Sequence, residues 1–190
     1  MYSWSSMRLL RRDVPLLIGF TLLLGACGPA KEAEPNDSYQ QATPLKGGGK
    51  ALGTIANPRD QDWYRLDIAA EGVLSAKIGG IRDVDFVLAF FDKDRRELKR
   101  VDETTVGGDE QLLDMGGSPG ACYLVVSNKN EKASNPAQVY ELQTVFAAPA
   151  GREREPNDTA LTAAVLEAGG LVKGHYWPMR QLLAEDPEAG

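Results

Sequence analysis

The sequence predicts an all-β protein, and three observations support this fold class. Across residues 50–146, short segments rich in β-branched and aromatic residues alternate with groups of Gly, Asp, Asn and Pro. The segment 139–146 alternates in polarity, which places Tyr140 and Leu142 on one face. No long stretch has an apolar stripe at helical spacing, since even residues 91–102 are charged all round. Short strands at this spacing bury their inner faces best as two packed sheets, so we expect a β-sandwich.

About eight strands are expected in chain order. They are Ala51 to Ile55, Trp63 to Ile68, Val73 to Ile78, Phe86 to Phe91, Glu97 to Val101, Gln111 to Met115, Cys122 to Ser127 and Val139 to Phe146. The run from Phe86 to Phe91 is apolar on both faces, so we expect it to be the central strand of a sheet. Alternation predicts that Trp63 and Tyr64 point to opposite faces, one of them into the core. Cys122 is predicted to be a buried small hydrophobe.

Length, composition and charge limit the function classes. The 190 residues are enough for one domain of ordinary size and part of another, and 43% of them are hydrophobic. The net charge is −6, and without residues 1–26 the chain keeps 18 basic and 26 acidic residues, a net charge of −8. A chain of this sign, with no basic patch among aromatics, is not expected to bind nucleic acid.

The first 26 residues have the pattern of a signal peptide. A basic leader, Met1 to Arg12, precedes an apolar run from Val14 to Leu24. This run of eleven residues is too short for a stable membrane-spanning helix but suits the apolar region of a signal peptide. We therefore predict that residues 1–26 are a targeting segment.

The residues that follow resemble the bacterial lipobox, in which a large aliphatic residue and two small residues precede a cysteine. Here they are Leu24-Gly25-Ala26-Cys27. The resemblance implies lipidation of Cys27, stable anchoring in a membrane, and a lipidated linker over residues 27–31. Gly28 after the cysteine implies the outer membrane of a Gram-negative bacterium. The alternative is an ordinary secretory cleavage site beside an incidental cysteine.

An acidic motif occurs twice. Residues 32–37 read Glu-Ala-Glu-Pro-Asn-Asp, and residues 153–158 read Glu-Arg-Glu-Pro-Asn-Asp. A shift of 121 residues aligns the two copies without a gap as far as Gly53 and Gly174. We predict a sandwich domain at 32–147, a linker at 148–152 and the start of a second, incomplete repeat at 153–190. About 38 residues cannot bury a sandwich core, so this second copy is either part of a longer tandem protein, which we favour, or an extension packed on the first domain.

Several motifs in this order resemble the bacterial pre-peptidase C-terminal domain. They are Glu-Pro-Asn-Asp at 34–37, Gly53-Thr54-Ile55, Asp60-Gln61-Asp62-Trp63-Tyr64, Gly72-Val73-Leu74, Asp85-Phe86-Val87-Leu88 and Gly120-Ala121-Cys122-Tyr123-Leu124-Val125-Val126. The resemblance covers about Glu32 to Phe146. This family is similar to the collagen-binding domains of clostridial collagenases, which implies a jelly-roll-like antiparallel β-sandwich without catalytic activity.

The resemblance also implies a candidate calcium site. In the calcium-binding members the ligands come from the acidic N-terminal segment and from an acidic turn before the Trp/Tyr strand. By position the candidates are Glu32, Glu34, Asn36, Asp37, Asp60 and Asp62. Their oxygens are the hard donors that Ca²⁺ prefers. The same residues also fit a turn in which Asn36 and Asp37 bond their own backbone and the glutamates are solvated.

Together these features predict a non-catalytic cell-envelope lipoprotein, held to the membrane by lipid and stabilised by calcium. The expected ligand is an extracellular polymer or a protein. Two alternatives stay open: an assembly or stabilising partner of a secreted protease, and an envelope hydrolase. Against the hydrolase, the sequence lacks a Gly-x-Ser-x-Gly elbow and a His-Glu-x-x-His helix, and its single histidine, His175, lies outside the complete domain. We expect His175 to have a packing or surface role.

Overall fold

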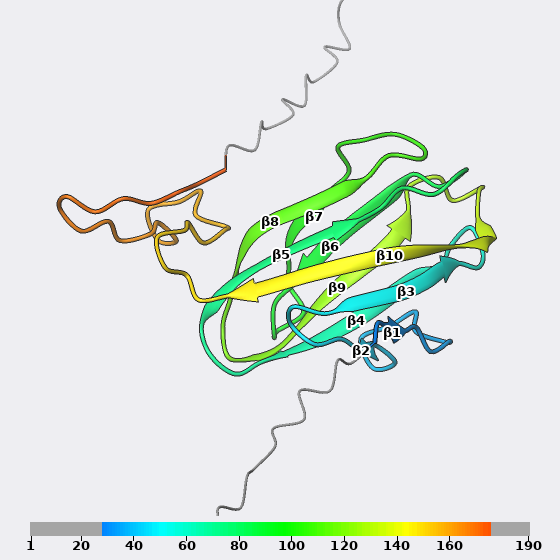
Figure 1. Cartoon of the computed structure of the whole chain (residues 1–190), viewed down its shortest axis with the longest axis horizontal. Helices are drawn as coiled ribbons and strands as arrows, with labels where there is room; N and C mark the ends of the chain where they lie inside the picture. The colour runs from blue at the N-terminus through cyan, green and yellow to red at the C-terminus, as the bar shows by residue number, and fades with distance from the viewer. Residues whose placement is uncertain (1–27, 176–190) are drawn as a thin grey trace, which may run out of the picture.

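The structure, a computed structural model, describes residues 28–175. Within these residues it contains ten strands and no helix (Figure 1). The strands are β1 (Ala30–Lys31), β2 (Thr43–Pro44), β3 (Lys50–Ile55), β4 (Gln61–Ile68), β5 (Gly72–Ile78), β6 (Phe86–Phe91), β7 (Glu97–Val101), β8 (Glu110–Gly117), β9 (Gly120–Asn128) and β10 (Asn135–Ala147). The predicted all-β class is therefore confirmed, and each of the eight expected strands is present, from β3 to β10.

Two five-stranded sheets form the sandwich. The first has the order β1-β3-β10-β5-β8, and the second has the order β2-β4-β9-β6-β7. Alternate residues of each strand face the space between the sheets, and Tyr140 and Leu142 of β10 are buried there as the polarity pattern predicts. Tyr64 is fully buried, while Trp63 is only partly buried on the opposite face of β4.

The expected antiparallel sandwich is confirmed for β3 to β10, and two short parallel pairings add to it at the sheet edges. The two-residue strands β1 and β2 pair in parallel with β3 and β4, respectively. Both belong to the segment before β3, which crosses from the edge of one sheet to the edge of the other. Two residues with an exposed edge are too short for a polarity pattern, which explains why the sequence did not predict these strands.

The prediction for Phe86 to Phe91, which form β6, was right about burial but wrong about the place of the strand in its sheet. Five of the six residues of β6 are buried, but β6 lies between β9 and β7, and β9 occupies the centre of the sheet. On the outer face of this sheet, the ring of Trp63 lies 5.0 Å from that of Phe91 and 6.0 Å from that of Tyr123. These rings give the sheet apolar cover on its outer side as well.

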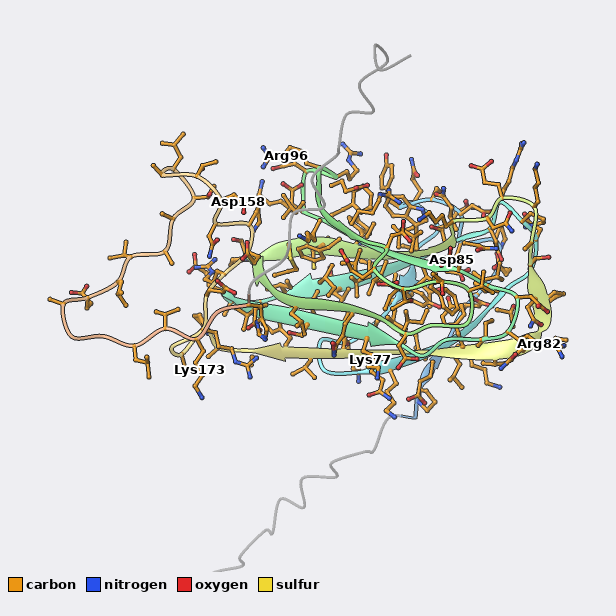
Figure 2. All side chains as sticks on the ribbon, turned by 90° about the horizontal axis from the view of Figure 1, so that it is seen from above. Lys77, Arg82, Asp85, Arg96, Asp158 and Lys173 are labelled. Carbon is orange, nitrogen blue, oxygen red and sulfur yellow. The ribbon has the colours of Figure 1, made fainter. Side chains whose placement is uncertain are left out.

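The chain beyond β10 contacts the sandwich at the free edge of β8. The backbone N–H of Gly116 donates to the carbonyl of Glu155 at 2.7 Å, and the N–H of Glu155 donates to the carbonyl of Asp114 at 2.9 Å. Arg152 forms an ion pair with Asp114 at 3.1 Å. In Figures 1 and 2 the rest of this segment, with Asp158 and Lys173, extends beyond the two sheets.

The predicted signal peptide and Cys27 lie outside the described residues, as do residues 176–190. Between residues 28 and 175 there is no helix of the length and apolarity that crossing a bilayer requires. Cys122 is a free, buried cysteine on β9, as expected, and its burial raises the pKa of the thiol to about 12.

Candidate functional site

The candidate site forms where residues 32–54, here named the first strap, close over the edges of both sheets. The N–H of Glu32 donates to the carbonyl of Leu52 at 3.0 Å, which continues the parallel pairing of β1 and β3. The carbonyl of Asn36 accepts a hydrogen bond from the N–H of Trp63 at 3.1 Å, which ties the strap to β4. These main-chain contacts aim the acidic side chains of the strap at the start of β4.

Three carboxylates converge at this point. Glu32, Glu34 and Asp62 each place one oxygen so that the three oxygens lie within 4.8 Å of one another. Asp62 is fully buried, Glu32 is partly buried and Glu34 is exposed. Three acidic groups at this separation repel one another strongly, because the protein on one side keeps water away. Only a proton or a cation can neutralise them, since the described residues place no Lys, Arg or His ion pair on any of the three.

The side-chain amide of Asn36 completes the cluster. It is fully buried, and one of its terminal atoms lies 3.2 Å from Oδ1 of Asp62 and 3.2 Å from Oε1 of Glu34. With its nitrogen turned toward them, the amide donates a hydrogen bond to both carboxylates. With its oxygen turned toward them, it adds a fourth oxygen to the set. The amide therefore suits both a cation-free and a cation-bound cluster.

Glu32 has one oxygen satisfied and one without a donor. Oε1 accepts hydrogen bonds from the N–H of Thr54 at 2.7 Å and from its hydroxyl at 3.0 Å. Oε2 is buried and receives no hydrogen bond. Burial raises the pKa of Glu32, although the bonds from Thr54 oppose the rise. A proton shared with the neighbouring carboxylate, or a bound cation, would give this oxygen the partner that it lacks.

Asp62 connects the cluster to the core of the sandwich. Its Oδ2 accepts a hydrogen bond of 2.5 Å from the hydroxyl of Tyr140, and that hydroxyl lies 2.7 Å from the hydroxyl of Tyr64. Burial raises the pKa of Asp62 to about 9; the bond from Tyr140 lowers it, and the nearby negative charge of Glu32 adds to the rise. In the cation-free protein Asp62 therefore holds a proton at neutral pH.

The two remaining candidates, Asp37 and Asp60, flank the cluster and have other partners. Asp60 is buried, and its Oδ2 accepts a hydrogen bond from the N–H of Ala56, which closes the turn before β4. Asp37 is exposed, and its Oδ1 accepts a long hydrogen bond of 3.4 Å from the N–H of Gln61. Burial raises the pKa of Asp60, and the nearby negative charge of Asp37 adds to that rise. The two acids therefore interact electrostatically.

Sequence reasoning missed the side chains that support the site from behind. Thr54 and Tyr64 belong to motifs of the family resemblance, but neither those motifs nor the alternation around Tyr140 marked them as partners of the acids, because that role depends on β3, β4 and β10 meeting in space. Gly53 did carry a signal, since the repeat preserves a glycine at the aligned position. A Cβ at Gly53 would lie 2.3 Å from Oε2 of Glu32 and 2.4 Å from the hydroxyl of Tyr140.

The donor set fits a hard divalent cation. Carboxylate and amide oxygens are the ligands of Ca²⁺, which takes six to eight oxygens. Glu32, Glu34, Asn36 and Asp62 converge, while Asp37 lies beside them on the exposed side. Glu32 keeps one buried oxygen without a donor, and the buried amide of Asn36 contacts both Asp62 and Glu34. The fold and the site thus define an all-β sandwich with an oxygen-lined cluster under its N-terminal strap.

Comparison with known proteins returned solved structures only. No protein-family model matches the sequence, and no curated protein matches it. A pre-peptidase C-terminal domain of a collagenase from Bacillus anthracis is similar, with 13% identity and a TM-score of 0.44 over 54% of this chain and 93% of that domain. PliG of Aeromonas hydrophila, a periplasmic inhibitor of g-type lysozyme, is 15% identical, with a TM-score of 0.39 over 56% of this chain and 97% of PliG. The first belongs to the family that the sequence resembles.

Proposed function

We propose that this protein is a non-catalytic binding or accessory module of the cell envelope whose first strap is fastened by Ca²⁺. The observation that carries the proposal is the convergence of three carboxylates on a buried amide, with one carboxylate oxygen left without a donor. A cation there would neutralise the acids and join the strap, which supplies Glu32 and Glu34, to β4, which supplies Asp62.

The absence of catalysis is part of the proposal. The acids of the site are directed at one another, at the backbone and at the core hydroxyl of Tyr140, as in a structural site. Paired catalytic carboxylates would instead face each other across a cleft that admits a substrate. The sandwich is then a rigid support, and its function is to present a surface to an extracellular polymer or protein.

The location in the envelope is proposed from the N-terminal sequence. The lipobox resemblance at Leu24 to Cys27 suggests a lipid anchor on Cys27, and Gly28 suggests the outer membrane. Two or more acyl chains are enough for stable anchoring. The sandwich would then lie next to the membrane, joined to it by the short linker at 27–31.

Calcium titration of the protein tests the cation. A ligand present at 100 times its dissociation constant stabilises a folded protein by about 2.7 kcal/mol. For a domain of this size that corresponds to a rise in Tm on the order of 10 °C. We expect such a rise with millimolar CaCl₂, accompanied by heat in isothermal titration calorimetry.

Two variants make the test specific. Asp62→Asn keeps the shape of the side chain but removes one ligand charge, and we expect it to abolish the response to calcium. Glu155→Gln is the matched control, because Glu155 aligns with Glu34 but lies in the second copy, where its backbone pairs with β8. It should respond like the unmodified protein. Absence of both heat and Tm shift at millimolar calcium would remove the cation from the proposal.

A further inference from the structure

The outer face of the second sheet, which is turned away from the core, carries a hollow. The registers of this sheet place Gln61 of β4 and Val87 of β6 on either side of Ser127 of β9. These three side chains point outward, because the residues that alternate with them along each strand are buried and point the other way. The hollow over this row measures about 580 Å³, a volume within the usual range of ligand sites.

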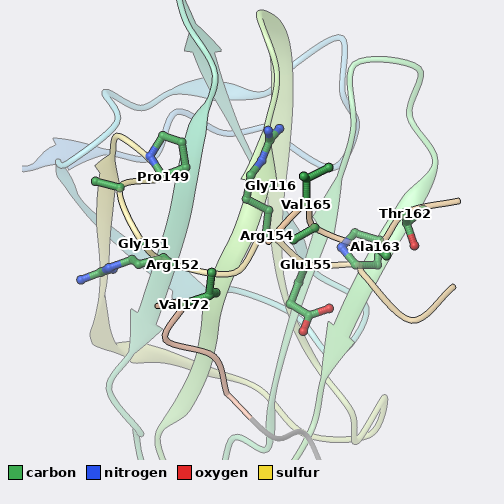
Figure 3. Close-up of a pocket in the computed structure, with 13 residues that line it drawn as sticks. Gly116, Pro149, Gly151, Arg152, Arg154, Glu155, Thr162, Ala163, Val165 and Val172 are labelled. Carbon is green, nitrogen blue, oxygen red and sulfur yellow. The ribbon is translucent and has the colours of Figure 1, made fainter. Parts of the chain in front are cut away.

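This hollow, here named the outer-face hollow, is built by the sandwich alone. All of its lining residues lie between positions 58 and 131. A different hollow of about 710 Å³ lies beside Gly116 and is lined mainly by the residues that follow β10 (Figure 3). In Figure 1 the end of β9, which borders the outer-face hollow, lies at the end of the sandwich opposite residues 153–175. The outer-face hollow therefore belongs to the predicted sandwich domain.

The lining of the outer-face hollow is polar and has no net charge. Of its eleven residues, only Pro58 and Val87 are apolar. The charged ones are three basic and three acidic residues: Arg59, Arg100, Lys129, Asp60, Asp102 and Glu131. The centres of protein–protein interfaces are instead apolar and poor in charge, and a polyanion needs a positive field. The lining thus favours a ligand that is polar and uncharged.

Several polar groups of the hollow lack a partner in the part of the chain that the structure describes. Oδ1 of Asp102 is buried and receives no hydrogen bond, while its Oδ2 lies 2.6 Å from Nζ of Lys129. Neither the hydroxyl of Ser127 nor the guanidinium of Arg59 has a hydrogen bond or an ion pair within residues 28–175. A buried acceptor without a donor is costly, so a ligand that donates to Oδ1 of Asp102 gains affinity there.

Trp63 orients a further donor at the rim. Its Nε1 donates to Oε1 of Gln61 at 3.4 Å, and this leaves the NH₂ group of Gln61 without a partner among the described residues. Gln61 is on β4 and Asp102 directly follows β7, and these strands are separated by β9 and β6. Four neighbouring strands span about 14 Å. Free donors and acceptors are therefore spread over a surface longer than a single small group.

We propose that the outer-face hollow binds a neutral polysaccharide. A sugar hydroxyl both donates and accepts hydrogen bonds. One chain of sugars can therefore donate to Oδ1 of Asp102 and accept from Ser127, Gln61 and Arg59, without bringing a charge into the hollow. The inference rests on the proposed binding role of the protein and names the chemical class of the extracellular polymer.

Isothermal titration calorimetry of the full chain tests the proposal. The probes are four uncharged oligosaccharides, cellohexaose, xylohexaose, maltohexaose and N-acetylated chitohexaose, with an oligogalacturonate of the same length as the charged comparison. We expect saturable binding of at least one uncharged probe at millimolar concentration, and none of the oligogalacturonate. Titrations with CaCl₂ and with a chelator separate this test from that of the strap. Lack of a calcium response contradicts the cation, whereas lack of sugar binding contradicts only the ligand of the hollow.

Two variants locate the binding. Asp102→Ala removes the unpartnered acceptor and should weaken binding about tenfold, the effect of losing a hydrogen bond to a charged group. Ser127→Tyr fills the hollow from the outer face of β9 and should abolish binding. The matched controls are Asp109→Ala and Gln111→Tyr. Asp109 also pairs with a lysine, at 2.8 Å, and Gln111 is exposed on a strand of the other sheet; neither lines the hollow. Both controls should bind like the unmodified protein, and urea denaturation checks that all four variants fold.

Four results would overturn the proposal. The first is that the folded protein binds none of the uncharged probes. The second is binding that Asp102→Ala and Ser127→Tyr leave unchanged, because the sugar would then contact another surface. The third is binding of the oligogalacturonate alone, which would make the hollow an anion site. The fourth is binding of an extended Gly-Ser peptide more tightly than any sugar, lost in Asp102→Ala, which would make a protein the occupant.

Discussion

At the scale of single residues, the site depends on how one buried carboxylate is neutralised. Asp62 lies between Glu32 on the strap and Tyr140 in the core, and no basic side chain among the described residues forms an ion pair with it. In the cation-free protein a bound proton neutralises Asp62, and in our proposal Ca²⁺ neutralises it instead. Metal binding then releases a proton, as for other sites built from acidic ligands.

The raised pKa of Asp62 predicts how stability depends on pH without added cation. Its folded-state pKa, about 9, lies above its ordinary value of 3.8, so the folded state binds the proton more tightly. This contribution is complete below about pH 4 and is lost as the pH rises toward 9. The free energy of unfolding, measured by urea titration in the presence of a chelator, should therefore fall across this range.

Asp62→Asn provides the comparison for the pH prediction. The variant has no proton to lose at this position, so its stability should fall less steeply between pH 4 and pH 9. Some slope should persist, because burial also raises the pKa of Glu32, Glu34 and Asp60. Equal slopes for the two proteins would mean that Asp62 is ionised in the folded state at neutral pH.

At the scale of elements, the local sequence pattern predicts where strands form but not their order in the sheets. Strand β10 was predicted from its alternating polarity and strand β6 from its apolar run, because both patterns can be seen in consecutive residues. The order of strands was not, since two apolar runs such as β6 and β9 are equally suited to the centre of a sheet. Strand β9 is the central one, because it pairs with β4 and β6 and each of these has a further strand on its other side.

The first strap and its second copy, residues 153–175, each carry a leucine at the same aligned position. Leu45 is buried and Leu166 is exposed, so the two can be compared directly. Leu45→Ala empties a buried site, and such a change costs about 2 to 5 kcal/mol. Leu166→Ala alters an exposed side chain at the aligned position, so its effect on unfolding should stay within about 0.5 kcal/mol. Chemical denaturation of both variants, compared with the unmodified protein, measures the difference. Similar losses for the two would mean that Leu166 is covered in solution.

At the scale of the whole molecule, the two straps lie at opposite edges of one sheet. The first strap follows β1 and ends in β3, and residues 153–175, the second strap, contact the β8 edge. Edge strands invite pairing with other chains unless something protects them. Contacts such as Arg152 with Asp114 limit access to β8, while the second strap itself presents a new uncovered edge.

The proposed anchor makes a prediction for the complete chain. In a Gram-negative host, labelled palmitate should be incorporated into the unmodified protein, which should fractionate with the outer membrane. Cys27→Ser should incorporate no label, because only the thiol forms the thioether. Cys122→Ser is the control and should be labelled normally, since Cys122 is buried within β9. Labelling that persists in Cys27→Ser would exclude this anchor.

The sequence by itself determined the all-β class, the positions of eight strands and the repeated acidic motif. These features are local, because alternation and turn residues act over a few positions. Only the tertiary structure decided the strand order, the parallel pairing of β1 and β2, and which acids converge. Glu32 meets Thr54 across 22 residues, and Asp62 meets Tyr140 across 78. Such contacts depend on how the sheets pack, and no local pattern encodes that.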